Sequence, residues 1–445
     1  MPRANLTAIL FTALISFVCY QAQDRNPYGR YFAEIMEHVE QRYVEEVNPE
    51  RLFASAVNGM LSDLDENSMY IGPEEAGEFR QTLDQEFGGI GIHVDRDDMT
   101  RELTVMGTIV DTPAYKAGIL AGDKIVKIDG QVVTELDQPT LQIRGKVGEP
   151  VRLTILRKGD TEPVELPPIE RAIIQVPSVI GDTRRPDGSW NYYVPGNSRI
   201  AYVRIATFGK HTSEELERVM SDIYDRGLDA LVLDLRNNPG GYLEAAVKAC
   251  DLFLESGTIV TVRGRDSSLI RERREATGPG TYSGFPMAVL INRFSASASE
   301  IVAASLQDNG RAIVVGERSF GKGTVQNVIA LGDGKRDLKL TTAYYFRPNN
   351  KKIHRRPDPT QPDGHESEKE EWGVMPDEGY RIKLSDEELH KWLEWRNRRD
   401  VPSTDGKPAK TESPDKQLDK QLDKQLDKAV EYLQKQLDKG KANAA

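Results

Sequence analysis

The feature that most restricts the possible folds is a regular alternation of strand and helix patterns after Ile200. The apolar runs AYVRIATF, DALVLDLR, TIVTVRG and MAVLIN alternate with helical spacing at 213–226 and 243–254, and a further helix is expected to begin near Ser297. Strands that alternate with helices of this length predict a layered α/β core. A chain of 445 residues is too long for one compact core, which suggests two or three domains. We predict a multidomain α/β protein whose core spans residues 171–396.

Two segments with different periodicity precede this core. In residues 24–86, apolar side chains from Tyr31 to Tyr43 recur every four positions and do so again after Pro49, which predicts two helices joined by a turn. Residues 87–170 contain short alternating strands separated by glycines, a pattern typical of a small β-rich domain.

The two ends of the chain are expected to lie outside the folded domains. Residues 1–23 contain Arg3 and then an apolar run from Leu6 to Tyr20, which predicts export by a signal peptide. Cleavage of this segment and its retention as a membrane anchor, with membrane association through residues 4–20, remain open alternatives.

A polar segment, residues 397–445, closes the chain. It begins with a proline-containing linker and continues into the tetrapeptide QLDK, which starts at positions 417, 421, 425 and 436. Leucines four residues apart, with lysines and aspartates at helical spacing, predict a marginal helix that is mostly solvated. Self-association or adaptor binding through this helix is the alternative.

Charge and cysteine content exclude several classes of protein. The formal net charge of -11 and the pI near 5.3 argue against binding to nucleic acid, because phosphate backbones are bound mainly by clustered basic residues. Of the two cysteines, Cys19 lies in the export segment, so no disulfide is expected in the mature chain. Cys250 lies among apolar residues at helical spacing and is predicted to be a buried core residue.

The segment from Val289 to Gln326 contains the most informative chemistry. Its SASAS sequence places Ser295, Ser297 and Ser299 where a strand is expected to give way to a helix. A helix N-terminus exposes unpaired N–H groups that can stabilise a developing oxyanion. The alternative for each serine is that it caps or packs the helix.

A lysine in a glycine frame follows this helix. Gly321 and Gly323 flank Lys322, and the apolar strand RAIVVG precedes it. A lysine drawn away from water becomes neutral more readily, and a neutral amine can take the proton of a serine hydroxyl. A surface or phosphate-contacting turn is the alternative, but the Walker sequence is excluded because glycine, not serine or threonine, follows Lys322.

These motifs together resemble those of the C-terminal processing peptidases, or tail-specific proteases. The resemblance extends from about Tyr31 to Leu389 and includes SASASEI, FGKGTVQ, TTAYYF, DLRNNPGG and GVMPDE. It implies a crotonase-like α/β protease core with Ser297 as nucleophile, Lys322 as general base and Gln326 as the residue that orients the lysine.

The resemblance also implies the remaining parts of an acyl-transfer site. The N–H of Ala298 and that of either Gly240 or Gly241 are expected to bind the oxyanion, and the choice between the two glycines stays open. No metal ion or organic cofactor is needed for this serine and lysine mechanism.

The β-rich domain resembles a PDZ domain of the bacterial type. Its GGIG sequence, Gly89, Ile90, Gly91 and Ile92, is expected to bind a terminal carboxylate and an apolar last side chain. The expected partners are unfolded or flexible protein C-termini, bound as an added strand. The expected location is the bacterial periplasm or the outer face of a membrane.

Together these features predict a serine endopeptidase that recognises flexible C-terminal tails and cleaves them through an acyl-enzyme. A catalytically silent PDZ scaffold is one alternative. Another is a different acyl hydrolase on the same core, because a fold does not name its acyl donor.

Overall fold

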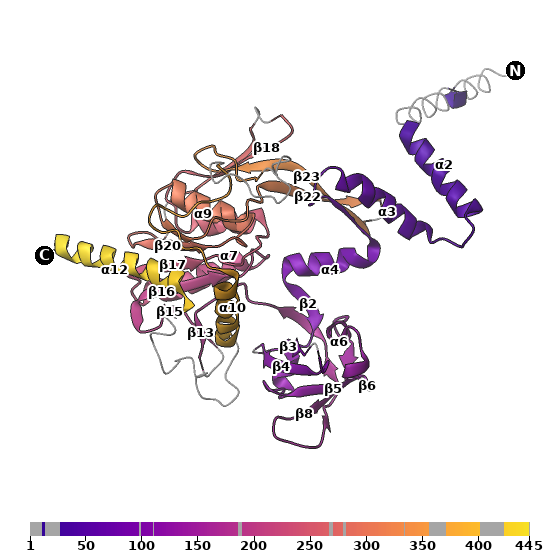
Figure 1. Cartoon of the computed structure of the whole chain (residues 1–445), viewed down its shortest axis with the longest axis horizontal. Helices are drawn as coiled ribbons and strands as arrows, with labels where there is room; N and C mark the ends of the chain where they lie inside the picture. The colour runs from indigo at the N-terminus through magenta and orange to yellow at the C-terminus, as the bar shows by residue number, and fades with distance from the viewer. Residues whose placement is uncertain are drawn as a thin grey trace. The chain divides into compact units, whose positions relative to one another are not determined.

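The computed structural model describes residues 11–13, 27–97, 99–109, 111–185, 189–266, 270–278, 282–332, 334–355, 371–400 and 422–444 (Figure 1). The chain divides into two compact units, residues 1–76 with 326–341 and residues 77–325 with 342–445. This division differs from the predicted domain boundaries, which stay predictions. Most of the predicted export segment lies outside the described residues, and within the described part no helix has the length and apolar character needed to cross a membrane.

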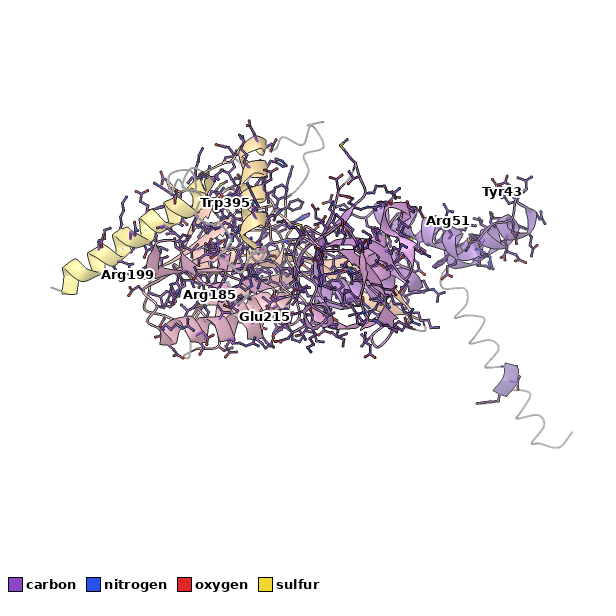
Figure 2. All side chains as sticks on the ribbon, turned by 90° about the horizontal axis from the view of Figure 1, so that it is seen from below. Tyr43, Arg51, Arg185, Arg199, Glu215 and Trp395 are labelled. Carbon is purple, nitrogen blue, oxygen red and sulfur yellow. The ribbon has the colours of Figure 1, made fainter. Side chains whose placement is uncertain are left out.

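The first unit contains the two predicted N-terminal helices, α2 (Pro27–Arg42) and α3 (Pro49–Ser62). Asn48 caps α3 by accepting the N–H of Arg51, which Figure 2 labels, and Pro49 follows at the first helical position, where a missing N–H costs nothing. Strand β1 (Met69–Ile71) pairs with residues 337–339 of β23 (Arg336–Phe346), and β22 (Thr324–Leu331) also pairs with β23.

The second unit begins within α4 (Pro73–Asp84) and continues into the β-rich domain. Strand β2 (Glu86–Gly89) enters this domain and pairs antiparallel with β11 (Ala172–Gln175), which leaves it. Its sheet has the order β3-β4-β5-β8-β9, with β6 beside β5. The bounds are β3 (Ile92–Arg96), β4 (Leu103–Thr108), α5 (Pro113–Lys116), β5 (Lys124–Ile128), β6 (Gln131–Val132), η1 (Val133–Glu135), α6 (Pro139–Ile143), β7 (Pro150–Val151), β8 (Leu153–Leu156), β9 (Val164–Glu165) and β10 (Ile169–Glu170).

The predicted α/β core is confirmed, and a six-stranded sheet forms its centre. The order is β12-β16-β17-β20-β21, with β15 also beside β16, and the pairs from β16 to β21 are parallel. Parallel strands buried on both faces read as continuous apolar runs, as in the MAVLI of β20. The bounds are β12 (Val179–Ile180), β15 (Tyr193–Val194), β16 (Asn197–Ile205), β17 (Ala230–Asp234), β20 (Met287–Ile291) and β21 (Ile313–Gly316).

Three helices cover one face of this sheet. They are α7 (Thr212–Asp225), α8 (Leu243–Asp251) and α9 (Ala298–Asp308), and they share one core with Val203, Leu233 and Val289. Cys250 of α8 is fully buried in this core, as predicted.

The C-terminal helix α12 (Lys424–Ala444) covers the opposite face of the sheet (Figure 1). Leu426, Ala429 and Leu433 are buried against alternate residues of the same strands, such as Tyr202 and Val232. The expectation of a mostly solvated helix is therefore wrong, because its apolar stripe completes the core. Self-association or adaptor binding through α12 stays a prediction, and the first QLDK repeat lies outside the described residues.

The remaining elements line the edges of the second unit. Strand β18 (Thr258–Arg263) pairs with β19 (Ile270–Glu275) and with residues 344–346 of β23. Strands β13 (Thr183–Arg184) and β14 (Trp190–Asn191) form a hairpin, and α10 (Asp386–Asp400) packs on β13.

Candidate active site

Ser297 stands immediately before the first residue of α9, at the end of the loop that follows β20. Its backbone has φ 54° and ψ -113°. Residues other than glycine seldom adopt this conformation, which costs on the order of 1–3 kcal/mol. The carbonyl of Ser297 accepts the N–H groups of Glu300 and Ile301 at 2.9 and 3.0 Å. Hydrogen bonds from the first turn of α9 thus stabilise the strained backbone of Ser297.

The two neighbouring serines have packing roles. The hydroxyl of Ser295 donates to the carbonyl of Leu235 at 2.8 Å, and that of Ser299 donates to the carbonyl of Asn238 at 3.0 Å. Both serines are fully buried. The alternative of packing therefore describes Ser295 and Ser299, and both of them attach the start of α9 to the segment after β17.

A buried carboxylate joins the serine loop to the lysine loop. Oε2 of Glu300 accepts the N–H of Ser297 and the N–H of Lys322, each at 2.8 Å. Its Oε1 accepts the N–H of Gly321 at 2.7 Å and the hydroxyl of Ser319 at 2.6 Å. The backbone N atoms of Ser297 and Lys322 are therefore joined by two hydrogen bonds to the same oxygen atom.

The electrostatic state of this carboxylate reflects two opposing effects. Burial raises the pKa of Glu300 to about 7, although all four hydrogen bonds favour its charged form. Sequence reasoning missed Glu300, but the signal was present in Ser297-x-x-Glu300, the spacing in which a glutamate accepts the N–H of the residue before a helix.

Lys322 lies in the extended segment between β21 and β22 and is half-buried. Within the described residues it forms no ion pair with a carboxylate. Gly323 beside it has no room for a side chain, because a Cβ there would lie 2.2 Å from the N atom of His354. The glycine frame recognised in the sequence thus allows this segment to pack closely on its neighbour.

The turn predicted to supply an oxyanion donor lies against Ser297. A Cβ added to Gly240, whose φ is 104°, would lie 2.7 Å from the Cβ of Ser297. The N–H of Gly240 donates to Oδ1 of Asn238 at 2.9 Å. In the described part of the chain, the N–H groups of Gly241 and Ala298 have no hydrogen-bond partner, which leaves both available to a ligand.

Gln326 is in the first compact unit, on β22. Its Nε2 donates to the hydroxyl of Thr341 at 3.3 Å, and that hydroxyl donates to Oδ1 of Asp65 at 3.2 Å. The orientation of Lys322 by Gln326 stays a prediction.

The four residues of the GGIG sequence line a cavity of about 320 Å³. Its walls are largely apolar, and Arg144, whose guanidinium lies 4.4 Å from the ring centre of Phe87, adds a positive charge. His93 also lines it, and burial together with the charge of Arg184 lowers the pKa of that imidazole. The cavity therefore combines an apolar wall with a cation, which suits the end of a peptide chain.

Two family models match parts of the chain. The family model described as peptidase family S41 matches residues 199–365, and the model described as PDZ domain matches residues 88–167.

Two curated relatives match most of the chain. A carboxy-terminal-processing protease of Bartonella bacilliformis is 41% identical over 72% of this chain and 71% of its own length. The carboxy-terminal processing protease CtpB of Bacillus subtilis is 34% identical over 72% of this chain and 64% of its own length. The chain therefore belongs to peptidase family S41, as a serine endopeptidase of the carboxy-terminal processing type with a PDZ domain.

Proposed function

We propose that this peptidase cleaves unfolded or flexible protein C-termini through a Ser297 and Lys322 dyad, after its PDZ domain has bound the free end. The observation that carries the proposal is the single oxygen of Glu300 that accepts both Ser297 N–H and Lys322 N–H. The backbones of two residues 25 positions apart in the sequence are thereby held close together, and a nucleophile and its base must lie close together for proton transfer.

The proposed reaction begins with attack of the Ser297 hydroxyl oxygen on the carbonyl carbon of a peptide bond. The amine of Lys322 acts as the base and takes the hydroxyl proton, and it then gives this proton to the amine that departs as the peptide C–N bond breaks. Water, deprotonated by the same lysine, then attacks the ester carbon, and the lysine returns this proton to the Ser297 oxygen as the acyl C–O bond breaks and the new carboxyl end leaves. The N–H of Ala298, with that of Gly240 or Gly241, is proposed to stabilise the oxyanion in both steps.

Of the two glycines, Gly241 is the better donor candidate in the described arrangement. The N–H of Gly240 is already bound by Asn238, whereas no described residue accepts that of Gly241. Gly240 supports the proposal in another way, because its missing side chain allows the turn to approach Ser297.

Substrate selection is proposed to reside in the GGIG cavity. Main-chain binding of an added strand recognises a free, extended end with little dependence on sequence. The apolar wall suits a small or apolar last side chain, and Arg144 suits a nearby carboxylate.

The test is cleavage of an unfolded reporter protein with an apolar C-terminus, compared with the same reporter ending in two aspartates. We expect the parent to prefer the apolar end and expect Ser297→Ala and Lys322→Ala to reduce turnover at least 1,000-fold, on the order found for such groups. Ser221→Ala and Lys248→Ala change the same residue types at exposed positions and are expected to keep the parent rate.

Each outcome separates the alternatives. Full turnover by either dyad variant would contradict the mechanism. A folded but inactive parent would favour the silent scaffold, and hydrolysis of esters without peptides would favour another acyl hydrolase.

We also propose export of the chain to the periplasm or the outer face of a bacterial membrane, on the basis of residues 1–23. Fusion of these residues to alkaline phosphatase, an enzyme that folds only after export, is expected to give activity outside the cytoplasm. Recovery of that activity in the soluble or the membrane fraction distinguishes a cleaved signal from an anchor, and activity no higher than that of a leaderless fusion counts against export.

A further inference from the structure

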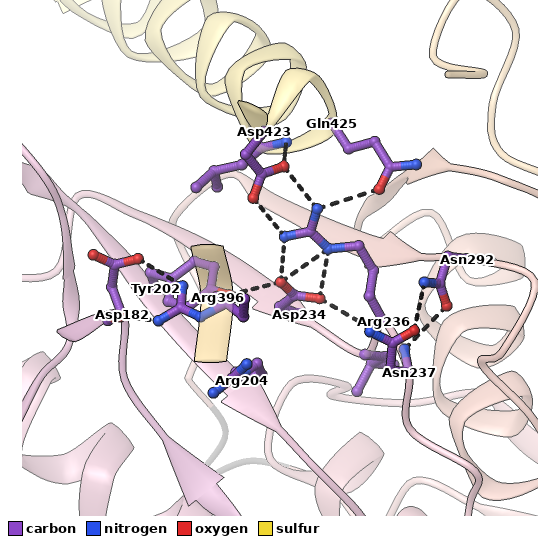
Figure 3. A network of polar contacts seen from close by, with 12 residues as sticks. Asp182, Tyr202, Arg204, Asp234, Arg236, Asn237, Asn292, Arg396, Asp423 and Gln425 are labelled. Atoms are coloured by element: carbon purple, nitrogen blue, oxygen red, sulfur yellow. Dashed lines mark hydrogen bonds and ion pairs between the residues drawn. The ribbon is translucent and has the colours of Figure 1, made fainter. Parts of the chain in front are cut away.

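A buried arginine connects the turn beside Ser297 to the C-terminal helix. Arg236 follows β17 and has 1% of its side chain exposed. Its Nε donates to both carboxylate oxygens of Asp234 at 3.0 Å (Figure 3). Its two outer nitrogens donate to Asp423 at 2.7 and 2.9 Å, the fork geometry in which arginine binds a carboxylate most strongly.

Asp423 belongs to the second QLDK repeat and lies directly before α12. Its carboxylate also accepts the indole N–H of Trp392 at 3.0 Å and caps α12 by accepting the N–H of Leu426 at 3.0 Å. Burial opposes the charge of this carboxylate, but Arg236 and the N–H groups of Leu426 and Trp392 together lower the pKa of Asp423 below its ordinary value. The charged form is therefore the one that the tail brings to Arg236.

Asp234 alone does not fix the arginine completely. It binds Nε and one outer nitrogen, Nη2. Among the described residues, the other, Nη1, donates only to the tail, to Asp423 at 2.7 Å and to Gln425 at 3.2 Å. The ring of Trp392 lies 4.5 Å from the guanidinium carbon. Asp423 and Gln425 of the tail, with Trp392 of α10, thus supply the contacts that Asp234 cannot.

Arg236 leads directly into the turn. Asn237, next in the chain, has φ 57° and exchanges two hydrogen bonds with Asn292 on the strand side of the Ser297 loop. Asn238 accepts the N–H of Ala296 at 3.0 Å with its carbonyl. Displacement of Arg236 would therefore reach Gly240 and Ser297 through a short, continuous set of hydrogen bonds.

We propose that Asp423 is a positioning residue of the peptidase: docking of the tail on the second face of the central sheet fixes Arg236 and, through it, the oxyanion turn beside Ser297. This inference rests on the proposed function, since it takes residues 237–241 as part of the acyl-transfer site. Asp423 does not touch the substrate and acts only through Arg236.

The repeat provides a test that separates the carboxylate from the length of the tail. Removal of residues 421–424 deletes one QLDK unit, and the sequence before Ala429 is restored because an identical unit precedes it. Asp419 then occupies the sequence position of Asp423. We expect this deletion variant to keep the parent activity.

The first comparison uses the full chain with Asp423→Asn, and with Asp438→Asn as the matched control, an exposed aspartate in the last QLDK unit. We expect Asp423→Asn to lower kcat at least tenfold with KM changed less than threefold, and to speed amide hydrogen exchange in residues 235–241. Asp423→Glu is expected to restore part of kcat, and Asp438→Asn to match the parent.

The second comparison introduces Asp419→Asn into the deletion variant and is expected to reproduce the loss of kcat. A folded Asp423→Asn variant with the parent's kcat overturns the proposal, as does a folded deletion variant that is inactive. If Asp423→Asn does not fold, Asp423→Glu decides: a three- to tenfold fall in kcat at the parent's Tm supports positioning, and an unchanged kcat refutes it.

The two proposals fail separately. Full activity of Ser297→Ala refutes the dyad whatever happens at Asp423. An active parent, an inactive Ser297→Ala and a fully active Asp423→Asn together refute the positioning role alone.

Discussion

Replacement of Glu300 by glutamine tests how the serine and lysine loops are joined. Glu300→Gln keeps the size of the side chain but exchanges one oxygen for an NH₂ group, which can only donate. The four partners of Glu300 all donate to it, and of these only the Ser319 hydroxyl can turn and accept. With its oxygen toward Ser297 and Lys322, the amide leaves the Gly321 N–H without an acceptor.

The cost follows from these contacts. A buried N–H without an acceptor costs about 1–3 kcal/mol, and a loss of about 1.4 kcal/mol from the transition state is a tenfold loss of rate. Because Gly321 adjoins Lys322, we expect Glu300→Gln to lower kcat by about five- to 150-fold, the range to which 1–3 kcal/mol corresponds. Glu317→Gln is the control, since that buried carboxylate accepts the N–H of Leu384 and lies near Arg293, and no described hydrogen bond joins it to Ser297, Gly321 or Lys322.

The same substitution changes how stability depends on pH. The folded protein holds the Glu300 proton up to a pKa of about 7, whereas the unfolded chain loses it near 4.5. Folding is therefore favoured by this group below pH 4.5, and the contribution falls as pH rises to 7, by about 3 kcal/mol at 1.36 kcal/mol per pH unit. Glutamine does not titrate, so the variant lacks this decline.

Urea unfolding followed by tryptophan fluorescence measures the difference, because all four tryptophans, at 190, 372, 392 and 395, lie in the second unit. We expect the free energy of unfolding of the parent, relative to Glu300→Gln, to fall by about 3 kcal/mol between pH 4.5 and 8. An equal difference at both pH values would refute the raised pKa, and an unchanged kcat would refute the role of Glu300 in joining the loops.

Three further predictions concern other sites. Gly240→Ala is expected to abolish cleavage, because its Cβ would lie 2.7 Å from that of Ser297. Turnover and Tm are measured beside those of Gly227→Ala, which changes a glycine of similar φ with open space around it. Full turnover by Gly240→Ala would contradict the close approach of the turn to Ser297. Gly91→Ala is expected to weaken binding of a peptide with an apolar C-terminus at least tenfold, because its Cβ would lie 2.4 Å from Thr112. Gly118→Ala is the control, since its Cβ would meet no atom within 4 Å. Fluorescence anisotropy measures both affinities, and equal values would refute the clash with Thr112. Burial raises the pKa of the Cys250 thiol to about 12, so iodoacetamide at pH 8 is expected to modify Cys250 only after urea unfolding. Peptide mapping measures the labelling, and rapid labelling of Cys250 in the folded chain would contradict its burial.

Much of the fold follows from local patterns. The apolar runs of β16, β17 and β20 are continuous because both faces of these strands are buried, and the intervening helices show their own period. Asn48 and Pro49 mark the start of α3 with a cap and a fixed φ. Each of these signals depends on residues that are close in sequence, which is why the sequence suffices.

The candidate site was predictable in its residue types but not in its connections. The SASAS and GKG motifs make Ser297 and Lys322 candidates, which stay predictions, and the Ser-x-x-Glu spacing is the local signal from which a cap by Glu300 could have been expected. The partners of that carboxylate at Ser319 and Gly321 are 19 and 21 residues away, and only the packing of α9 beside the lysine segment brings them together.

The C-terminal helix shows the same division most clearly. The spacing of leucines in the QLDK segment is enough to predict a helix with leucines along one side, but that pattern fits a solvated helix as well as a docked one. Tertiary structure decided between them, because the central sheet has a second apolar face to cover and because Arg236, 187 residues before Asp423, needs a buried anion. Burial of Leu426, Ala429 and Leu433 together with a charge-paired Asp423 holds the helix in place, and no local pattern in the repeat contains that information.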